Sequence, residues 1–260
     1  MTGRAQYDDA WANAAHIPHA ESYVSRWPEQ AEAFRAAHPP EVLAYGGGER
    51  QAVDLFRPEG VAKGLMVFVH GGYWLRFGRR DWSHLAAGAL AEGWAVALPG
   101  YELCPQVRIG QITRQIAAAV DVAAAGVAGP VRLCGHSAGG HLVARMGDAG
   151  VALASRGRIA GIVPISPVAD LAPLMLTSMN DRLRIDDAEA RAESPVHQPR
   201  PAVPVHVWVG AAERPVFVAQ ARALAQVWGA ELTVEEGRHH FDVVEGLERA
   251  GSPLLRAVLG

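Results

Sequence analysis

Short runs of apolar residues alternate along the chain with longer segments in which apolar side chains recur every three or four residues. The runs predict strands, and their nearly continuous valine, isoleucine, leucine and alanine content indicates that both faces are buried. We expect strands at residues 51–56, 65–69, 94–98, 131–134, 159–165, 205–209 and 231–235. The longer segments predict helices at residues 82–92, 109–125, 138–149, 216–228 and 242–258. This order is typical of an α/β protein, with a mostly parallel sheet between two layers of helices.

Two stretches fall outside this alternation. Residues 1–40 precede the first strand and are rich in aromatic side chains, so we expect a helical segment that either covers the cleft or packs elsewhere on the surface. Residues 168–204 form a long connection with several leucines and methionines, which predicts a lid. No boundary to a second domain is visible, so we expect one α/β domain over residues 1–260.

Composition and charge narrow the class of partner. Hydrophobic residues make up 50% of the 260 positions and charged residues 20%, which indicates a globular chain. The net charge of −3, without a basic run, gives no reason to expect nucleic acid or an anionic membrane, so we expect a small-molecule substrate. Residues 1–10 lack a signal-peptide core and no apolar stretch could span a bilayer, which predicts a cytoplasmic protein. The oligomeric state stays open, with a homodimer as one option.

Metal and cofactor chemistry lacks support in the sequence. Cys104 and Cys134 have no zinc-binding spacing and are expected to be buried free thiols. The segment from His16 to His19 has metal-like spacing, but it contains Pro18 and lacks a third ligand, so we interpret it as a loop. Phosphate-binding and dinucleotide-binding glycine motifs are missing, and no cofactor is expected.

The segment from Gly135 to Gly140 reads Gly-His-Ser-Ala-Gly-Gly and follows a short apolar strand. Glycines two positions before and after Ser137 allow a sharp strand-to-helix turn, because no bulky Cβ obstructs the strained backbone. Such a turn pushes the serine hydroxyl out of the backbone into a cleft. We therefore predict that Ser137 is a nucleophile rather than part of an ordinary glycine-rich turn.

A serine hydroxyl needs a base within hydrogen-bond reach and a group that orients this base. In folds built on such a turn, the chain order is serine, acid, histidine. Of the 11 histidines, His239 and His240 come late enough to follow an acid. We choose His240, because Phe241 can anchor the next helix in the core and leave His239 at the surface or in a supporting role.

The acid is expected in the loop after the strand at residues 205–209, at the edge of the sheet where ligands bind. Glu213 lies in this loop and is our candidate, although a favourable charge at a helix start would also explain it. Asp170 is the main alternative, because it follows the preceding strand. Asp242 is a weaker alternative.

Attack on a carbonyl also requires donors for the oxyanion, each worth about 3 to 4 kcal/mol. The segment from His70 to Trp74 reads His-Gly-Gly-Tyr-Trp and directly follows an apolar strand. Glycines there let backbone N–H groups turn into the cleft. We expect donors from Gly71, Gly72 and Ala138, and we expect His70 to hold the loop by hydrogen bonds.

These segments, together with the late His-Phe pair at residues 240–241, resemble the α/β-hydrolase fold in its branch related to hormone-sensitive lipase. Within this branch the chain is most similar to kynurenine formamidases (arylformamidases), also at Asp81 and Trp82 and from Ser166 to Leu171. Many relatives carry aspartate where this chain has Glu213, but glutamate is an accepted acid of such triads. The resemblance implies hydrolysis of an aryl formamide such as N-formylkynurenine.

In the implied reaction Ser137 attacks an acyl carbonyl while His240 takes its proton, and water then releases the acid from the acyl-enzyme. The triad does not distinguish an ester, a thioester and an activated amide, so a short-chain carboxylesterase is the alternative. A non-catalytic ligand-binding protein is the alternative from another class. Four side chains near the oxyanion loop and in the long connection are either pocket walls or core residues: Tyr73, Trp74, Met175 and Met179.

Overall fold

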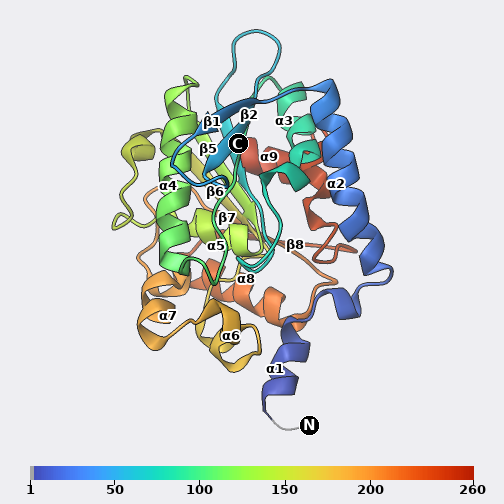
Figure 1. Cartoon of the computed structure of the whole chain (residues 1–260), viewed down its shortest axis with the longest axis vertical. Helices are drawn as coiled ribbons and strands as arrows, with labels where there is room; N and C mark the ends of the chain where they lie inside the picture. Colours follow the sequence, from blue (N-terminus) through green and yellow to red (C-terminus); the bar gives the residue numbers. More distant parts are fainter. Residues whose placement is uncertain (1–2) are drawn as a thin grey trace.

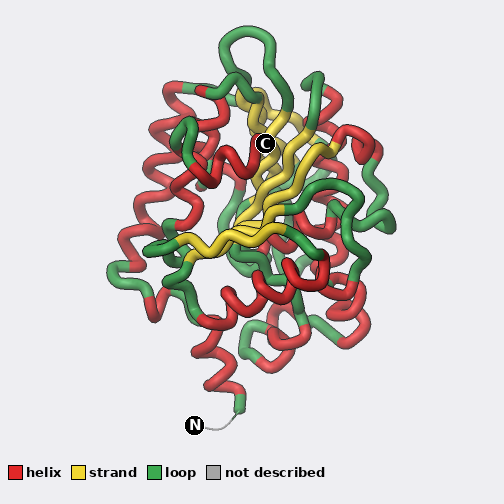
Figure 2. Tube along the Cα trace, turned by 180° about the vertical axis from the view of Figure 1, so that it is seen from behind, coloured by secondary structure: helices red, strands yellow, loops and turns green. Residues whose placement is uncertain are grey.

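The computed structural model describes residues 3–260, and an 8-stranded sheet runs through its centre (Figure 2). The strands are β1 (Glu41–Ala44), β2 (Ala52–Phe56), β3 (Leu65–Val69), β4 (Ala95–Pro99), β5 (Val131–His136), β6 (Ile159–Ile165), β7 (His206–Gly210) and β8 (Glu231–Glu235). Their order across the sheet is β1-β2-β4-β3-β5-β6-β7-β8. β2 pairs antiparallel with β1 and β4, and the pairs from β4 to β8 are parallel. The predicted α/β class with a mostly parallel sheet is confirmed.

Helices cover both faces of this sheet (Figure 1). They are α1 (Arg4–Trp11), α2 (Ala20–Ala37), α3 (Ala87–Ala91), α4 (Ile109–Ala125), α5 (Ala138–Arg145), α6 (Asn180–Leu183), α7 (Asp187–Glu193), α8 (Pro215–Trp228) and α9 (Pro253–Leu259). Buried residues of α4, α5 and α8 pack on one face, whereas those of α2, α3 and α9 pack on the other. Between residues 3 and 260, no helix has the length and hydropathy needed to cross a bilayer.

Alternation along β3 explains why both faces of the sheet are apolar. Leu65, Val67 and Val69 belong to the buried cluster under α4 and α5. Met66 and Phe68 belong to the buried cluster on the opposite face. Successive strand side chains point to opposite faces, so a strand between two helical layers must be apolar at every position.

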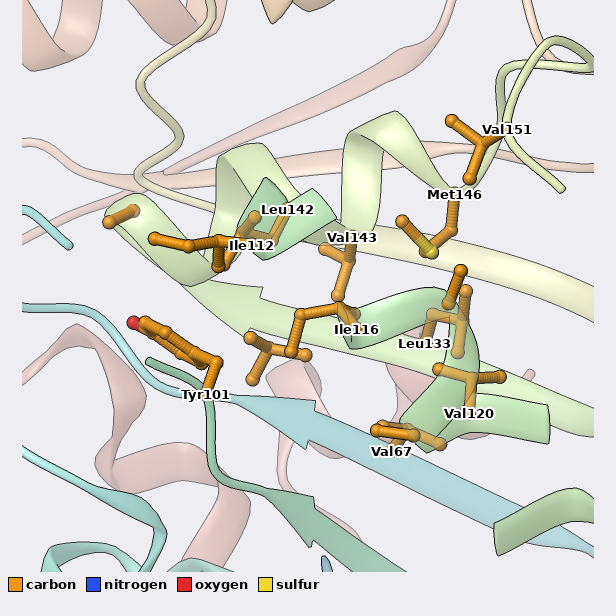
Figure 3. Packing of buried hydrophobic residues seen from close by; sticks show 14 of the residues in the cluster. Val67, Tyr101, Ile112, Ile116, Val120, Leu133, Leu142, Val143, Met146 and Val151 are labelled. Atoms are coloured by element: carbon orange, nitrogen blue, oxygen red, sulfur yellow. The ribbon is translucent and has the colours of Figure 1, made fainter. Parts of the chain in front are cut away.

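The contact between α4 and the sheet follows from helical periodicity. Ile112, Ile116 and Val120 recur every four residues and therefore share one face of α4. Figure 3 shows Ile116 and Val120 close to Val67 of β3 and Leu133 of β5. Complete burial of each such side chain stabilises the fold by about 1.5–3 kcal/mol, so this face fixes α4 against the sheet.

Several predicted boundaries differ from the structure. The predicted helix at residues 82–92 is a 3₁₀ turn over Ser83–Ala86 followed by α3, and the helix predicted at residues 138–149 ends at Arg145. The predicted segment at residues 242–258 divides into a 3₁₀ turn (Val243–Glu248) and α9. The division occurs because Ser252 caps a new helix: its Oγ accepts a hydrogen bond from the Leu255 N–H at 3.1 Å.

The long connection contains α6 and α7 and is tied to α5. Glu193 of α7 is buried, and its carboxylate accepts hydrogen bonds from Thr113 Oγ1 at 2.7 Å and from Arg145 Nε at 3.1 Å. His141 Nε2 donates to the Glu193 carbonyl at 2.7 Å. Buried, charge-assisted hydrogen bonds of this kind hold the α7 end of the connection in place.

Candidate active site

Ser137 occupies a sharp turn between β5 and α5. Its φ and ψ angles are 58° and −117°, a backbone conformation that L residues rarely adopt. A Cβ added at Gly135 would lie 2.3 Å from the carbonyl oxygen of Gly139, and one added at Gly139 would lie 2.0 Å from that of Val69. Both positions therefore require glycine, which is the physical reason for the Gly-x-Ser-x-Gly pattern.

The structure brings His240 and Glu213 together at the carboxyl edge of the sheet. His240 Nδ1 lies 2.6 Å from Glu213 Oε2, and both side chains are buried, with 4% and 0% exposed. A carboxylate can only accept, so Nδ1 carries the proton and Nε2 keeps its lone pair. This is the tautomer that a general base requires.

The second oxygen of Glu213 is held by two further donors. Ser166 Oγ donates to Oε1 at 2.5 Å, and the Gly210 N–H donates to the same oxygen at 2.8 Å. Ser166 has no role in the sequence-based site, although it directly follows β6 at the edge where the other site residues lie. The two donors fix the plane of the carboxylate, so Oε2 stays aimed at His240.

The alternative candidates for the base and the acid make other contacts. The His239 ring packs edge-on against Tyr23 at 5.2 Å, and Asp242 accepts a hydrogen bond from the His239 N–H at 2.7 Å. Asp170 closes a turn, with its Oδ1 accepting from the Ala172 N–H at 2.9 Å. Within residues 3–260, no carboxylate other than that of Glu213 is hydrogen-bonded to His240.

Two aromatic rings pack against the imidazole of His240. The His136 ring centroid lies 4.5 Å from that of His240, and the Phe217 centroid lies 4.2 Å away. Burial, together with the nearby positive charge that His240 can carry, holds the pKa of His136 well below its usual range. His136 is therefore neutral at pH 7 and does not oppose protonation of His240.

Ser137 and His240 line the same cavity. Among the described residues, no hydrogen bond joins the Ser137 hydroxyl to the imidazole. Catalytic hydrogen bonds are often long without substrate and tighten when it binds, so this geometry is compatible with a serine-histidine pair.

Three backbone N–H groups around Ser137 are available as donors. Within residues 3–260, no carbonyl or side chain accepts a hydrogen bond from the N–H of Gly71, Gly72 or Ala138. Gly71 lies close to Ser137, since a Cβ at Gly71 would lie 3.0 Å from Ser137 Cβ. Ala138 begins α5, where free N–H groups and the helix dipole both favour negative charge. These groups can stabilise an oxyanion.

His70 holds the loop that carries the two glycines. Its Nδ1 lies 2.8 Å from the Gly71 carbonyl, and the Tyr101 hydroxyl donates to the His70 carbonyl at 2.9 Å. The two rings are stacked with centroids 4.2 Å apart. Burial lowers the pKa of His70 to about 3, so its ring is neutral and takes a supporting position.

The cavity at Ser137 is small and has aromatic walls. Its volume is about 30 Å³. Its aromatic lining comes from α2, from residues 73–82 and from the residue after His240: Trp27, Tyr73, Phe77, Trp82 and Phe241. A wider groove of about 500 Å³ adjoins it, because Asn13, Gly72, Tyr73 and Arg76 line both spaces.

The predicted substrate pocket needs two corrections. Tyr73 lines both spaces and Met179 lines the wider groove, but Trp74 and Met175 line neither of them. Trp74 is fully buried, because left-handed φ angles of 53° and 56° at Tyr73 and Trp74 turn it into the core. There its ring packs edge-on against His141 at 5.0 Å. Met175 packs against the main hydrophobic cluster.

Comparison with known proteins places this geometry in a family. A family model described as the alpha/beta hydrolase fold matches residues 66–240, which include Ser137, Glu213 and His240. The chain belongs to this family. The matched range begins in β3 and leaves α1 and α2 outside it.

Individual relatives agree with this assignment. A kynurenine formamidase from Drosophila melanogaster is 31% identical over 225 residues, covering 78% of this chain and 75% of the relative. One from Salmo salar is 27% identical over 225 residues, covering 79% and 76%. These matches confirm the resemblance to kynurenine formamidases.

Solved structures that resemble this chain include esterases and a proposed thioesterase. A proposed thioesterase from Silicibacter sp. TM1040 is 51% identical, with a TM-score of 0.95 and coverage of 98% of this chain and 99% of the other. Esterase 2 from Thermogutta terrifontis is 20% identical, with a TM-score of 0.66 and coverage of 85% and 90%, and shows the fold alone. Fold, family and relatives together identify the chain as a hydrolase.

Proposed function

We propose that the chain is a serine hydrolase that removes the formyl group from an aryl formamide such as N-formylkynurenine. His240 Nε2 takes the proton of Ser137 Oγ as this oxygen attacks the formyl carbon. The N–H groups of Gly71, Gly72 and Ala138 stabilise the oxyanion, and Glu213 holds the imidazolium. The arylamine leaves with the proton from His240. Water, activated by His240, then releases formate and restores Ser137.

The size of the cavity at Ser137 carries the choice of a formyl group. At about 30 Å³ the cavity is much smaller than the adjoining groove of about 500 Å³, which favours a small acyl group next to Ser137. The adjoining groove of about 500 Å³, with Tyr73 on its wall, is wide enough for an aromatic amine. The similarity to kynurenine formamidases supports the same substrate class.

The N-terminal segment belongs to this proposal as a cover of the cleft. Trp27 of α2 and Asn13 line the cavity at Ser137. Arg214, next to the orienting acid, donates to the Asp9 carboxylate at 2.8 Å, and the Ser178 N–H donates to that of Asp8 at 2.6 Å. These contacts tie α1 to the loops around the site. Movement of the long connection as a lid stays a prediction, as do the cytoplasmic location and the oligomeric state.

Assaying N-formylkynurenine beside a short-chain nitrophenyl ester tests the proposal. We expect turnover of the formamide, and we expect it to be lost in Ser137→Ala. A fluorophosphonate should label the wild-type protein and not this variant. Turnover of the ester without any of the formamide would overturn the proposed substrate.

A short-chain esterase or thioesterase is the second candidate. It is favoured by the 51% identity to the proposed thioesterase from Silicibacter sp. TM1040. Including an acetyl thioester in the same assay separates this candidate. Each compound reacts through a tetrahedral intermediate on Ser137, but the three differ in acyl group and leaving group, so the preferred substrate identifies the class. A wild-type protein that is not labelled by the fluorophosphonate would instead favour a non-catalytic ligand-binding role.

A further inference from the structure

Asn13 carries a buried acceptor that no protein group uses. The residue follows α1 in the chain, before α2 begins, and only 5% of it is exposed. Its Oδ1 is buried, and within residues 3–260 it has no hydrogen-bond partner. A buried polar atom without a partner costs about 1–3 kcal/mol, so such an atom in a cavity wall calls for a ligand. Asn13 lines both the cavity at Ser137 and His240 and the wider groove that adjoins it.

The hydroxyl of Tyr73 determines which end of the Asn13 amide is free. This hydroxyl donates its one proton to the Trp11 carbonyl at 2.7 Å, because a carbonyl can only accept. Toward Asn13 it can offer only a lone pair, and Asn13 Nδ2 donates to it at 3.3 Å. The hydrogen bond from Nδ2 to Tyr73 therefore fixes the orientation of the amide. Oδ1 remains free to accept a hydrogen bond from a ligand.

The tyrosine cannot give up this role by ionising. Burial raises the pKa of Tyr73 above its ordinary value, and this effect outweighs the positive charge of Arg76, which lowers it. The hydroxyl therefore keeps its proton near neutral pH and donates it to the Trp11 carbonyl. Asn13 Oδ1 is thus a permanent acceptor, held by a chain of two hydrogen bonds.

We propose that Asn13 Oδ1 accepts the scissile N–H of the substrate and so makes the site select N–H acyl compounds over esters. The inference rests on the proposed function and names a specificity residue for it. A formanilide offers one N–H next to the carbonyl carbon, and this group satisfies the buried acceptor. The corresponding ester has an oxygen without a proton at this position. Asn13 Oδ1 is then left without a donor, and its lone pair lies opposite a lone pair of the ester oxygen. Sites built to pair a substrate N–H reject the analogue that lacks it.

The test compares two substrates that differ in one atom, an aryl formamide and the formate ester of the matching phenol. The ratio of their kcat/KM values is measured in the wild type and in Asn13→Leu, which keeps the side-chain volume and removes the acceptor. Because the intrinsic reactivity of each substrate is the same with both proteins, it cancels in the change of the ratio. We expect the formamide-to-ester ratio to fall about 10-fold, as for the loss of one hydrogen bond.

A second variant, Tyr73→Phe, probes the fixed orientation while keeping the Asn13 acceptor. It frees the amide to rotate, so we expect the same ratio to fall about threefold, less than in Asn13→Leu. Melting temperature and fluorophosphonate labelling report whether each variant is folded. A ratio that stays at the wild-type value in Asn13→Leu would overturn the inference and leave the proposed function standing. A wild-type protein that cleaves the ester and not the formamide would overturn both.

Discussion

Replacing Glu213 by glutamine gives a strong test of the catalytic geometry, because the structure determines how the new amide must sit. Oε1 accepts hydrogen bonds from Ser166 Oγ and from the Gly210 N–H, so the glutamine oxygen has to take this position. The NH₂ group then replaces Oε2 and faces His240 Nδ1, which lies 2.6 Å from it. The imidazole must turn its Nδ1 lone pair to this donor and carry its proton on Nε2.

The expected loss of activity follows from this tautomer. With a proton on Nε2, His240 cannot take the proton of Ser137, and enzymes with this defect lose about 10⁴-fold in kcat. That factor corresponds to about 5.5 kcal/mol of transition-state stabilisation. Stability should change much less, because every hydrogen bond of the site keeps a donor and an acceptor. We expect the melting temperature to fall by about 2–4 °C, as for a loss near 1 kcal/mol.

Initial rates with N-formylkynurenine and with a nitrophenyl ester measure the effect for both proposed substrate classes. Asp170→Asn is the matched control, since asparagine can still accept the hydrogen bond of the Ala172 N–H, and its kcat should stay within about threefold of the wild type. Glu213→Asp, which preserves the carboxylate, should retain more activity than Glu213→Gln. A Glu213→Gln protein with a tenth or more of the wild-type kcat would refute the assignment of the acid.

Three further predictions concern stability and positioning. Ser166→Ala removes a hydrogen bond to a buried carboxylate and should lower the free energy of unfolding by about 1.5–3 kcal/mol in urea titrations, with kcat reduced as well; unchanged values of both would contradict its role. Gly139→Ala would place a Cβ 2.0 Å from the Val69 carbonyl oxygen, so a loss of at least about 2 kcal/mol is expected, and a wild-type melting temperature would be incompatible with the turn. Burial lowers the pKa values of His70 and His141 to about 3 and about 4 from 6.5, so the unfolded chain binds protons below pH 6.5 that the folded chain excludes. Each should lower the free energy of unfolding by about 1 kcal/mol between pH 7.0 and 5.5, and equal stability at both pH values would contradict their neutral burial.

The central sheet could be predicted from sequence because its signal is local and continuous. The strand at Leu65–Val69 is apolar at each of its positions, which leaves a strand buried on both faces as the simplest interpretation. β1 was missed, since its residues are mostly exposed and it owes its existence to antiparallel pairing with β2. The break between Val243–Glu248 and α9 was also missed, because the apolar pattern continues through it while Ser252 and Pro253 start a new helix.

Residues of the candidate site also differ in how well the sequence predicts their positions. The turn at Ser137 is visible in sequence because steric contacts within one strand-turn-helix unit demand glycine at fixed spacing. Trp74 was ambiguous, since an aromatic residue beside the oxyanion loop fits both a pocket wall and the core. Its orientation depends on left-handed backbone angles at two consecutive residues that the sequence does not signal. The structure turns Tyr73 toward the cavity and Trp74 away from it.

The roles of Ser166 and Asn13 were missed in the sequence, because each residue acts on a group that is distant along the chain. Ser166 lies 47 positions from the carboxylate that it holds, and Asn13 lies 60 positions from the hydroxyl that orients its amide. Neither spacing belongs to a motif, because each contact depends on how two separate elements dock. Asn13 also lies outside residues 66–240, the range that the family model matches. Family members can therefore share the residues around Ser137 while a segment outside this range determines which leaving group is preferred. Exchanging residues 3–40 between family members should then change the formamide-to-ester ratio more than it changes fluorophosphonate labelling of Ser137.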